Sequence, residues 1–313
     1  MKKFAKILSI FAVFALAFSF AGCSSDDDDS SDDVTINGSG SGGTSSRIPE
    51  NFVKIPAVSI TGTESWTPKS EIFISGRKLE VASFYMSDHE VTRGEYKTVM
   101  GSDPSEADAY DKDGNELTGD DNVKNNPVNN INWYDALVYC NTLSIKENLT
   151  PCYSIDGKTD PSEWGTVPAS SDSKWNAATC DFTANGYRLP TEAEWEWAAR
   201  GGESYTYAGS NTIDEVAWYN GNANGGTRDV KTRKKNGYGL YDMCGNVWEW
   251  CWDKYGDISS DTADTGSASG VNRVRRGGSW NGYADFAQVA HLDNREPYYR
   301  VSNSGFRVVR TTK

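Results

Sequence analysis

The stretch from Arg275 to Arg310 reads RRGGSWNGYADFAQVAHLDNREPYYRVSNSGFRVVR. Its two ends, Val274–Trp280 and Gly305–Arg310, mix β-branched or aromatic residues with glycine and arginine, which predicts a strand at each end. The residues between them are mostly Asn, Asp, Tyr, His, Ser and Arg. This run is too polar for a core, and its mixture of rigid rings and adaptable polar groups is typical of binding surfaces. An ordinary irregular connection is the alternative interpretation.

The composition of the whole chain narrows the classes of function. Of its 313 residues, 37% are hydrophobic, and 30 glycines with 11 tryptophans favour a loop-rich fold with aromatic packing over a helical bundle. The net charge of −13 argues against nucleic acid as a partner, because phosphate binding needs basic patches. His89 and His291 are too few for a zinc site or a histidine relay, which disfavours acid–base catalysis.

Residues 1–22 have the pattern of a targeting segment. Lysines precede an apolar run, Ile7 to Phe20, that is too short to span a bilayer comfortably. The next residues, Ala21-Gly22-Cys23, complete what resembles the lipobox of bacterial lipoproteins, which implies lipidation of Cys23. A cleaved secretory signal that merely precedes a cysteine is the alternative. Residues 23–46 then form an acidic and Gly/Ser-rich tether, so we expect a protein lipid-anchored at the bacterial outer membrane or cell surface.

Residues 47–313 carry the signals of a single α+β domain with few helices, short strands and much loop. The predicted helices span residues 93–101, 133–146 and 192–200. Thr92 and Thr191 each begin a capping box, and Asn132 is expected to cap the middle helix. Gly201 is expected to stop the last one. The predicted N-terminal strands cover residues 52–55, 72–74 and 81–86.

The cysteines are spaced in a way that argues against redox or zinc chemistry, because no C-x-x-C pair occurs. Export permits disulfides. Cys152 and Cys180 flank an insertion-like segment and are predicted to form a bridge. Cys140 lies on the apolar face of the predicted helix 133–146 and is expected to be buried.

Six blocks of the sequence, in order along the chain, resemble the family of the formylglycine-generating enzyme, or sulfatase-modifying factor. They are Glu90–Tyr96, Pro127–Asn141, Gly186–Gly202, Gly239–Trp250, Arg276–Trp280 and Gly305–Arg310. Together they span nearly all of residues 52–310. The resemblance implies a variant of the C-type lectin fold.

The enzymatic residues of that family are missing here. The family's oxidase uses a cysteine pair that binds copper shortly after the Gly-Gly-Ser-aromatic block. Aligned on Gly277–Trp280, those positions fall on Gly282 and Ala287, which are neither ligands nor nucleophiles. The family's sulfoxide synthases use a histidine-rich iron site, for which this chain has too few histidines. We therefore predict that the chain is not an enzyme.

The resemblance also implies a candidate structural calcium site, although no cofactor is expected to be required. Asp242 and Glu249 would supply hard side-chain oxygens, and Gly245 and Val247 would supply backbone carbonyls between them. The alternative is that Glu249 pairs with a buried arginine instead.

The C-terminal stretch has a narrower resemblance, to the variable regions of proteins diversified by retroelements and, with the lipoprotein signal, to the Treponema variable protein class. In such systems mutated adenines let Asn codons that end in cytosine encode many residues, but never Gln, Glu, Trp, Lys or Met. Within residues 281–303 only Gln288 and Glu296 lie outside the reachable set, so both are predicted to be fixed.

The variable ligand-binding region is expected to span residues 277–306. The side chains and backbone positions expected to meet ligand there are Asn281, Gly282, Tyr283, Asp285, Phe286, His291, Asp293, Asn294, Arg295, Tyr298, Tyr299, Val301, Ser302 and Asn303.

The leading hypothesis is a surface-displayed binding lipoprotein whose residues 281–303 are diversified by a retroelement to bind varied ligands. A protein ligand is expected over a sugar, because the calcium-binding carbohydrate motif of true lectins is not visible in the sequence. The membrane would be reached through the lipid anchor only. A fixed envelope lipoprotein with a structural or accessory role is one alternative, and a cryptic enzyme of the formylglycine-generating-enzyme family is the other.

Overall fold

The computed structural model describes residues 50–62 and 66–312. The chain divides into two units, residues 1–45 and residues 46–313, and the described helices and strands belong to the second. The predicted signal segment 1–22, the lipidation site Cys23 and the tether 23–46 lie outside the described residues. Within the described residues, no helix is long and apolar enough to cross a membrane.

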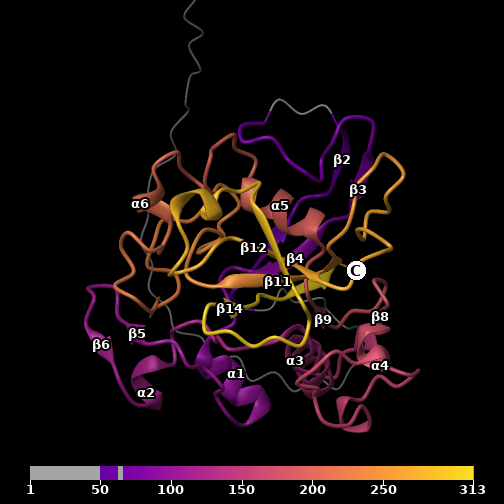
Figure 1. Ribbon diagram of the computed structural model, residues 1–313, viewed down its shortest axis with the longest axis horizontal. Helices are drawn as coiled ribbons and strands as arrows, with labels where there is room; N and C mark the ends of the chain where they lie inside the picture. The colour runs from indigo at the N-terminus through magenta and orange to yellow at the C-terminus, as the bar shows by residue number, and fades with distance from the viewer. Residues whose placement is uncertain (1–49, 63–65, 313) are drawn as a thin grey trace, which may run out of the picture. The chain divides into compact units, whose positions relative to one another are not determined.

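The described chain is an α+β fold of short elements joined by long loops (Figure 1). The helices are α1 (Arg93–Met100), α2 (Asp120–Val123), α3 (Trp133–Lys146), α4 (Ser173–Asn176), α5 (Glu192–Arg200) and α6 (Ile213–Val216), with 3-10 turns η1 (Pro161–Glu163) and η2 (Ala284–Ala287). The strands are β1 (Phe52–Ile55), β2 (Val58–Thr61), β3 (Lys78–Val81), β4 (Phe84–Ser87), β5 (Ala109–Tyr110), β6 (Glu116–Leu117), β7 (Tyr153–Ser154), β8 (Thr179–Cys180), β9 (Tyr187–Arg188), β10 (Thr227–Arg228), β11 (Trp248–Lys254), β12 (Arg273–Arg276), β13 (Leu292–Arg295), β14 (Ser304–Gly305) and β15 (Val309–Thr311).

The three longest helices begin at the caps that the sequence predicts. Thr92 and Thr191 form complete capping boxes before α1 and α5, and the Asn132 side chain caps α3. Gly101 and Gly201 end α1 and α5 in the left-handed conformation, with φ of 86° and 61°. These starts and stops are local hydrogen-bonding arrangements, which is why sequence alone suffices to place them.

A four-stranded sheet of order β13-β12-β11-β14 lies at the centre of the fold (Figure 1). The register places Glu249 of β11 between Arg276 of β12 and Gly305 of β14. Helix α5 packs against β11 and β12, while α1 and α3 pack against each other on the opposite side (Figure 1). This sheet carries both ends of the stretch that was expected to bind ligand.

A second four-stranded sheet, of order β1-β4-β15-β9, joins the two ends of the folded domain. Its register sets Val309 opposite Met86, and Phe52 opposite Ser87. The chain therefore passes from the central sheet at β14 to this second sheet at β15 within a few residues. Phe306 and Arg307 lie in that crossing and are completely buried.

The side chain of Arg307 is held at the crossing by a buried ion pair with Glu249. Arg307 Nε and Nη2 each donate to a Glu249 carboxylate oxygen at 2.6 Å, and both residues have no exposed surface. Trp195 Nε1 of α5 donates to the same carboxylate at 2.6 Å. Arg307 also donates to the carbonyls of Ser87 and Tyr241. One guanidinium thus joins β11, the end of β4 and the 305–309 crossing.

Four strand predictions were wrong in their extent. Residues 72–74 form a buried bend, because Ser70 Oγ accepts the N–H groups of Ile72 and Phe73. The run 81–86 is broken between β3 and β4, which belong to different sheets. The strand expected over 274–280 ends at Arg276, since Gly277 takes a φ of 95°. The strand expected over 305–310 is divided between β14 and β15.

The predicted disulfide was also wrong, because Cys152 and Cys180 are both free thiols. The register of β7 with β8 sets Cys180 opposite Tyr153. Cys152 lies just before β7 and is therefore not the residue that β7 sets opposite Cys180. Cys140 is fully buried in α3, as predicted.

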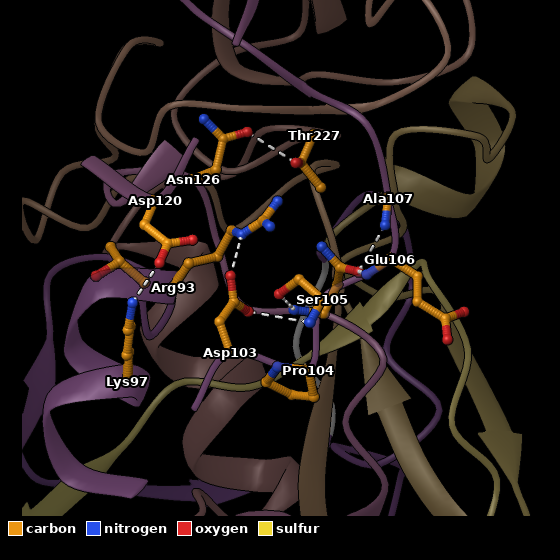
Figure 2. Close-up of polar contacts among 12 residues, drawn as sticks. Arg93, Lys97, Asp103, Pro104, Ser105, Glu106, Ala107, Asp120, Asn126 and Thr227 are labelled. Atoms are coloured by element: carbon orange, nitrogen blue, oxygen red, sulfur yellow. Dashed lines mark hydrogen bonds and ion pairs between the residues drawn. The ribbon is translucent and has the colours of Figure 1, made fainter. Parts of the chain in front are cut away.

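Residues 101–130 are tied to α1 and to β10 by polar contacts (Figure 2). Arg93 Nε lies 2.6 Å from Asp103 Oδ2, and Lys97 Nζ lies 2.5 Å from Asp120 Oδ2. Thr227 Oγ1 donates to the buried Asn126 Oδ1 at 2.8 Å. These contacts hold a loop that has little regular structure of its own.

The Glu249–Arg307 pair predicts a large cost for removing one partner alone. The substitution Glu249→Ala should lower the free energy of unfolding by about 3–5 kcal/mol, because it leaves a buried guanidinium unpaired. The double variant Glu249→Leu/Arg307→Met should recover much of this loss. Urea denaturation measures both, with the exposed-acid variant Glu116→Ala as the control. A loss below about 1 kcal/mol for Glu249→Ala would show that the pair is not a central constraint.

A second prediction concerns pH and the buried carboxyl groups at the start of α5. Burial raises the pKa of Glu192 to about 8 and that of Asp253 to about 7. A raised carboxyl pKa in the folded state contributes stability below the unfolded pKa, and this contribution is lost as pH rises through the folded pKa. The free energy of unfolding should therefore fall as pH rises from 4.5 to 8. Glu192→Gln should flatten this slope in pH-dependent urea titrations, and stability that rises over the same interval would contradict the assignment.

Candidate ligand-binding site

The segment of residues 281–303 leaves the central sheet and returns to it at neighbouring points. Trp280 N donates to Asn246 O at 2.7 Å, and Trp248 N donates to Asn303 O at 2.8 Å. Asn303 Nδ2 donates to Asn281 Oδ1 at 2.9 Å, which closes the base of the segment. Both ends are therefore fixed to residues around the start of β11.

The middle of the segment is held by a buried arginine of β12. Arg276 donates to the carbonyls of Val289 and Ala290 at 2.8 and 3.1 Å. Its guanidinium has no exposed surface and pairs with Glu196 of α5 at 2.6 Å. Val289 N in turn donates to Thr206 O at 3.0 Å. These bonds reach backbone atoms of the segment, so they do not depend on which side chains it carries.

The last third of the segment is held against α3. Trp133 N donates to Pro297 O at 3.0 Å, and Asn130 N donates to Val301 O at 3.1 Å. Arg300 makes a bidentate ion pair with Asp135, at 2.7 and 2.8 Å. The capping residues of α3 thus also position the segment.

Two elements inside the segment were missed by the sequence analysis. η2 covers Ala284–Ala287, and β13 (Leu292–Arg295) is an edge strand paired antiparallel with β12. Apolar and polar residues do not alternate along β13, whose sequence is Leu-Asp-Asn-Arg. All four residues are half-buried, so neither face of the strand is clearly inward. A strand of this kind gives no periodic signal, which explains why sequence reasoning treated it as irregular.

The residues expected to contact ligand fall almost entirely on the surface. Asn281, Tyr283, Asp285, Phe286 and Tyr299 are exposed, while His291, Asp293, Asn294, Arg295, Tyr298, Val301, Ser302 and Asn303 are half-buried. Gly282 is the buried exception. In contrast, Ala287, Val289, Ala290 and Pro297 point inward and are buried. The segment is therefore divided into an outward face and inward supports.

Aromatic rings gather in two places on this face. Phe286 lies 6.0 Å from Tyr283 and stacks on His291 at 5.0 Å. Tyr298 and Tyr299 stack at 4.8 Å. Tyr283 is 70% exposed, so a large apolar ring is left available to a partner. Burial, with Arg276 nearby, lowers the pKa of His291, so this ring is neutral at pH 7.

Several polar side chains of the face are already engaged with the frame. Asp293 pairs with Arg275, and Asn294 Oδ1 accepts from Asn272 Nδ2 at 2.7 Å. The guanidinium of Arg295 lies over the Tyr299 ring at 5.3 Å. Asp285 is exposed, and among the contacts of the described residues its carboxylate accepts one long hydrogen bond, 3.3 Å, from Gln288 Nε2. Asp285 and the aromatic rings are therefore the groups freest to meet a ligand.

The face extends beyond the segment to residues that the sequence did not single out. Residues Tyr219–Gly221 and Tyr283–Asp285 line a hollow of about 430 Å³. Asn220 N donates to Gly282 O at 3.0 Å, which fixes the two walls together. The Trp248 ring lies 6.4 Å from that of Phe286. Residues 218–220 are Trp-Tyr-Asn, a mixture of aromatic and polar residues like that of the segment. This composition was the one sequence feature that could have indicated that they belong to the face.

The residues of the candidate calcium site do not fit an ion at Glu249. Both oxygens of Glu249 accept from Arg307, whose positive charge lies where a cation would bind. Asp242 Oδ2 accepts from Lys231 N at 2.7 Å, and its Oδ1 has no hydrogen-bond partner among the described residues. Burial raises the pKa of Asp242 to about 6. The backbone N–H of Gly245 donates to Gly277, and that of Val247 donates to Glu90. The calcium site stays a prediction.

The positions that match the family's copper-binding cysteines, Gly282 and Ala287, are both buried under the face. Cys244 and Cys251 lie in the core, and burial raises the pKa of both thiols. A thiol with a raised pKa is a poor nucleophile and a poor metal ligand at neutral pH.

This α+β fold is a C-type lectin-like scaffold with an outward face built on its last segment. Residues 46–312 match the sulfatase-modifying factor enzyme 1-like domain, and the chain belongs to this family. It is 35% identical over 258 residues to the chaperone protein LppX of Paenibacillus barcinonensis, covering 76% of this chain and 83% of that protein.

Two further similarities point to different activities within the family. The structure matches Treponema denticola variable protein 1 with a TM-score of 0.72 and 38% identity, covering 83% of this chain and 95% of that one. The formylglycine-generating enzyme of Streptomyces coelicolor is 37% identical over 155 residues, which are 42% of this chain and 49% of that enzyme. The fold and family expected from the six sequence blocks are confirmed.

The division between the outward face and its supports predicts two opposite mutational effects. Tyr283→Ser and Tyr299→Ser should change the free energy of unfolding by no more than about 0.5 kcal/mol, because both side chains reach into solvent. Ala287→Asp should cost more than about 3 kcal/mol, because it buries an unpaired charge. Chemical denaturation of the three variants measures this, and equal losses would contradict the division.

The geometry of Glu249 predicts that the domain is stable without calcium. Thermal unfolding should give the same Tm in EGTA and in millimolar calcium, because Arg307 already neutralises the carboxylate. Asp242→Asn should behave like the parent protein in this comparison. A Tm that rises with calcium in the parent and not in Asp242→Asn would establish the ion.

Proposed function

We propose that this protein is a ligand-binding lipoprotein displayed on the bacterial surface, with residues 281–303 as a variable face that meets protein ligands. Lipidation of Cys23 would anchor it at the outer membrane or cell surface, and residues 23–46 would hold the domain away from the lipid. A retroelement would diversify the face. Neither a nucleic acid nor an enzymatic cofactor takes part in this function.

The observation that carries the proposal is that the segment is fixed largely through its backbone, while its most exposed side chains, among them Tyr283, Asp285 and Phe286, have little part in fixing it. Arg276, Trp133, Asn130 and Trp248 all donate to carbonyl groups of the segment. Side chains on the outward face can then change without loss of the bonds that position them. A rigid frame with exchangeable side chains is the arrangement that lets one scaffold serve many ligands.

The similarity to Treponema denticola variable protein 1 supports the variable character of the segment. That match covers most of both chains, and the residues 281–303, apart from Gln288 and Glu296, are compatible with Asn codons mutated at adenines. The inward residues Ala287, Val289 and Ala290 are small and apolar, and they would have to remain constant for the frame to persist.

A protein ligand suits the chemistry of the face. Exposed tyrosine and phenylalanine rings bury a large area at low entropic cost, and Asp285 with the neighbouring polar groups can select among partners. The absence of the family's cysteine pair supports a binding function over an oxidase function, because Gly282 and Ala287 have no side chain that could hold copper.

The DNA around the gene tests this proposal. We expect a near-copy of the segment encoding residues 277–306 that differs at adenines, beside a reverse transcriptase gene. Sequences from different isolates should vary at Tyr283, Asp285 and Tyr299 while Ala287 and Ala290 stay constant. Invariant surface positions without a template copy would contradict diversification and favour a fixed envelope protein.

A further inference from the structure

A second hollow of about 940 Å³ lies away from the ligand-binding face. Its walls come from α1, α3, the end of β4 and residues 229–232. None of the residues 281–303 lines it. Its volume is at the upper end of the range, about 300–1,000 Å³, that small-molecule sites occupy. The site is thus independent of the function proposed above.

The floor of this hollow is apolar. Tyr139 and Leu143 of α3 lie beside Phe52 of β1 and Val99 of α1. Tyr139 is only 3% exposed and stacks on Tyr96 at 5.4 Å, so the accessible part of the floor comes from the half-buried Phe52, Val99 and Leu143. A ligand that enters would therefore meet a rigid hydrocarbon surface.

Three carboxylates stand around this floor without a cationic partner. No ion pair within the described residues includes Glu50, Glu147 or Asp229. Glu147 Oε2 accepts from Tyr187 at 2.6 Å, and Asp229 Oδ1 accepts from Asn126 at 2.7 Å. Burial raises the pKa of Asp229, so a positive ligand would stabilise its ionised form.

The positive groups of the lining are mostly neutralised already. His89 lies between Asp88, at 2.5 Å, and Glu95, at 3.3 Å. Lys231 Nζ is paired with Asp88 at 2.7 Å. Lys124 is the remaining lysine of the lining, and no ion pair of the described residues includes it. The lining therefore presents an excess of negative charge to whatever binds.

The three carboxylates do not converge on a single small ion. Within the described residues, no three His, Cys, Asp or Glu side chains converge in a way that could hold a metal. Glu50 precedes β1, Glu147 follows α3, and Asp229 follows β10, so they approach the hollow from three directions. Separated negative groups around an apolar floor are complementary to separated positive groups on an apolar stem.

We propose that this hollow binds a linear aliphatic diamine or polyamine. The methylene stem lies along Phe52 and Leu143, and the ammonium groups bind Glu147 and Asp229. Charge-assisted hydrogen bonds to the carboxylates would supply specificity over neutral molecules of the same length. The chemistry is binding only, and no bond forms or breaks.

Isothermal titration of the full-length protein with cadaverine tests this site. Saturable binding is expected for cadaverine and not for the diol of the same length. Glu147→Gln should weaken binding at least about five-fold, because it removes a charge while it keeps an acceptor for Tyr187. Lys124→Gln should bind as well as the parent or more tightly. Glu116→Gln, an exposed acid of β6 outside the hollow, is the matched control and should bind like the parent.

Equal binding of the diol would overturn the proposal, as would unchanged cadaverine affinity in both Glu147→Gln and Asp229→Asn. The absence of any saturable binding at millimolar cadaverine would do the same. Thermal unfolding of each variant verifies that it is folded. Because Tyr283→Ser alters only the ligand-binding face, its cadaverine affinity should be that of the parent, which separates failure of this site from failure of the proposed function.

Discussion

The ion pair between Glu249 and Arg307 is the contact on which the two main sheets depend. Glu249 lies near the start of β11, and Arg307 lies where the chain crosses from β14 to β15. Two fully buried charges gain little net energy from each other, because removing both from water is costly. The pair instead restricts how the sheets are arranged. The Arg307 guanidinium donates to one carboxylate and two backbone carbonyls, and few other positions of the side chain would satisfy all of these bonds.

A second buried arginine–glutamate pair lies under the ligand-binding face. Arg276 is as deeply buried as Arg307, pairs with Glu196, and donates from Nη1 and Nη2 to the carbonyls of Ala290 and Val289. Arg275 reaches Asp293 of β13 and Ser304 of β14 from the adjacent position. Buried arginines therefore set the path of the segment through its backbone. Exposed side chains such as Tyr283, Asp285 and Phe286 have little part in holding the fold, whereas Asp293 and Asn294 are bonded to Arg275 and Asn272 of the frame.

Sequence reasoning succeeded where the determining interactions are local. Thr92, Asn132 and Thr191 mark helix starts because their side chains bond the backbone a few residues on. It failed where partners are distant in sequence. Nothing near residues 305–310 shows that the chain changes sheets there, and the bend at 72–74 depends on the Ser70 hydroxyl. The predicted Cys152–Cys180 bridge required a register that spacing does not reveal.

In the candidate site, too, sequence reasoning identified neighbouring residues but not residues from distant parts of the chain. Its outward residues could be identified from composition, since solvent-facing binding residues are polar and aromatic together. Composition could not identify Trp248 and residues 219–221 as parts of the face, because they come from other parts of the chain. The alternative pairing of Glu249 with an arginine was foreseeable, whereas its partner, Arg307, was identified only by the fold.

A saturation scan of residues 277–306, read out as the amount of folded protein, tests the central claim most directly. The account predicts broad tolerance at the outward positions, among them Tyr283, Asp285 and Tyr299, and intolerance at Gly278, Ala287 and Gly305. At Gly278 φ is 80°, and a Cβ at Gly305 would lie 2.3 Å from Val128 O. Tolerance spread evenly along the segment, or intolerance at the exposed tyrosines, would contradict a fixed backbone with exchangeable side chains.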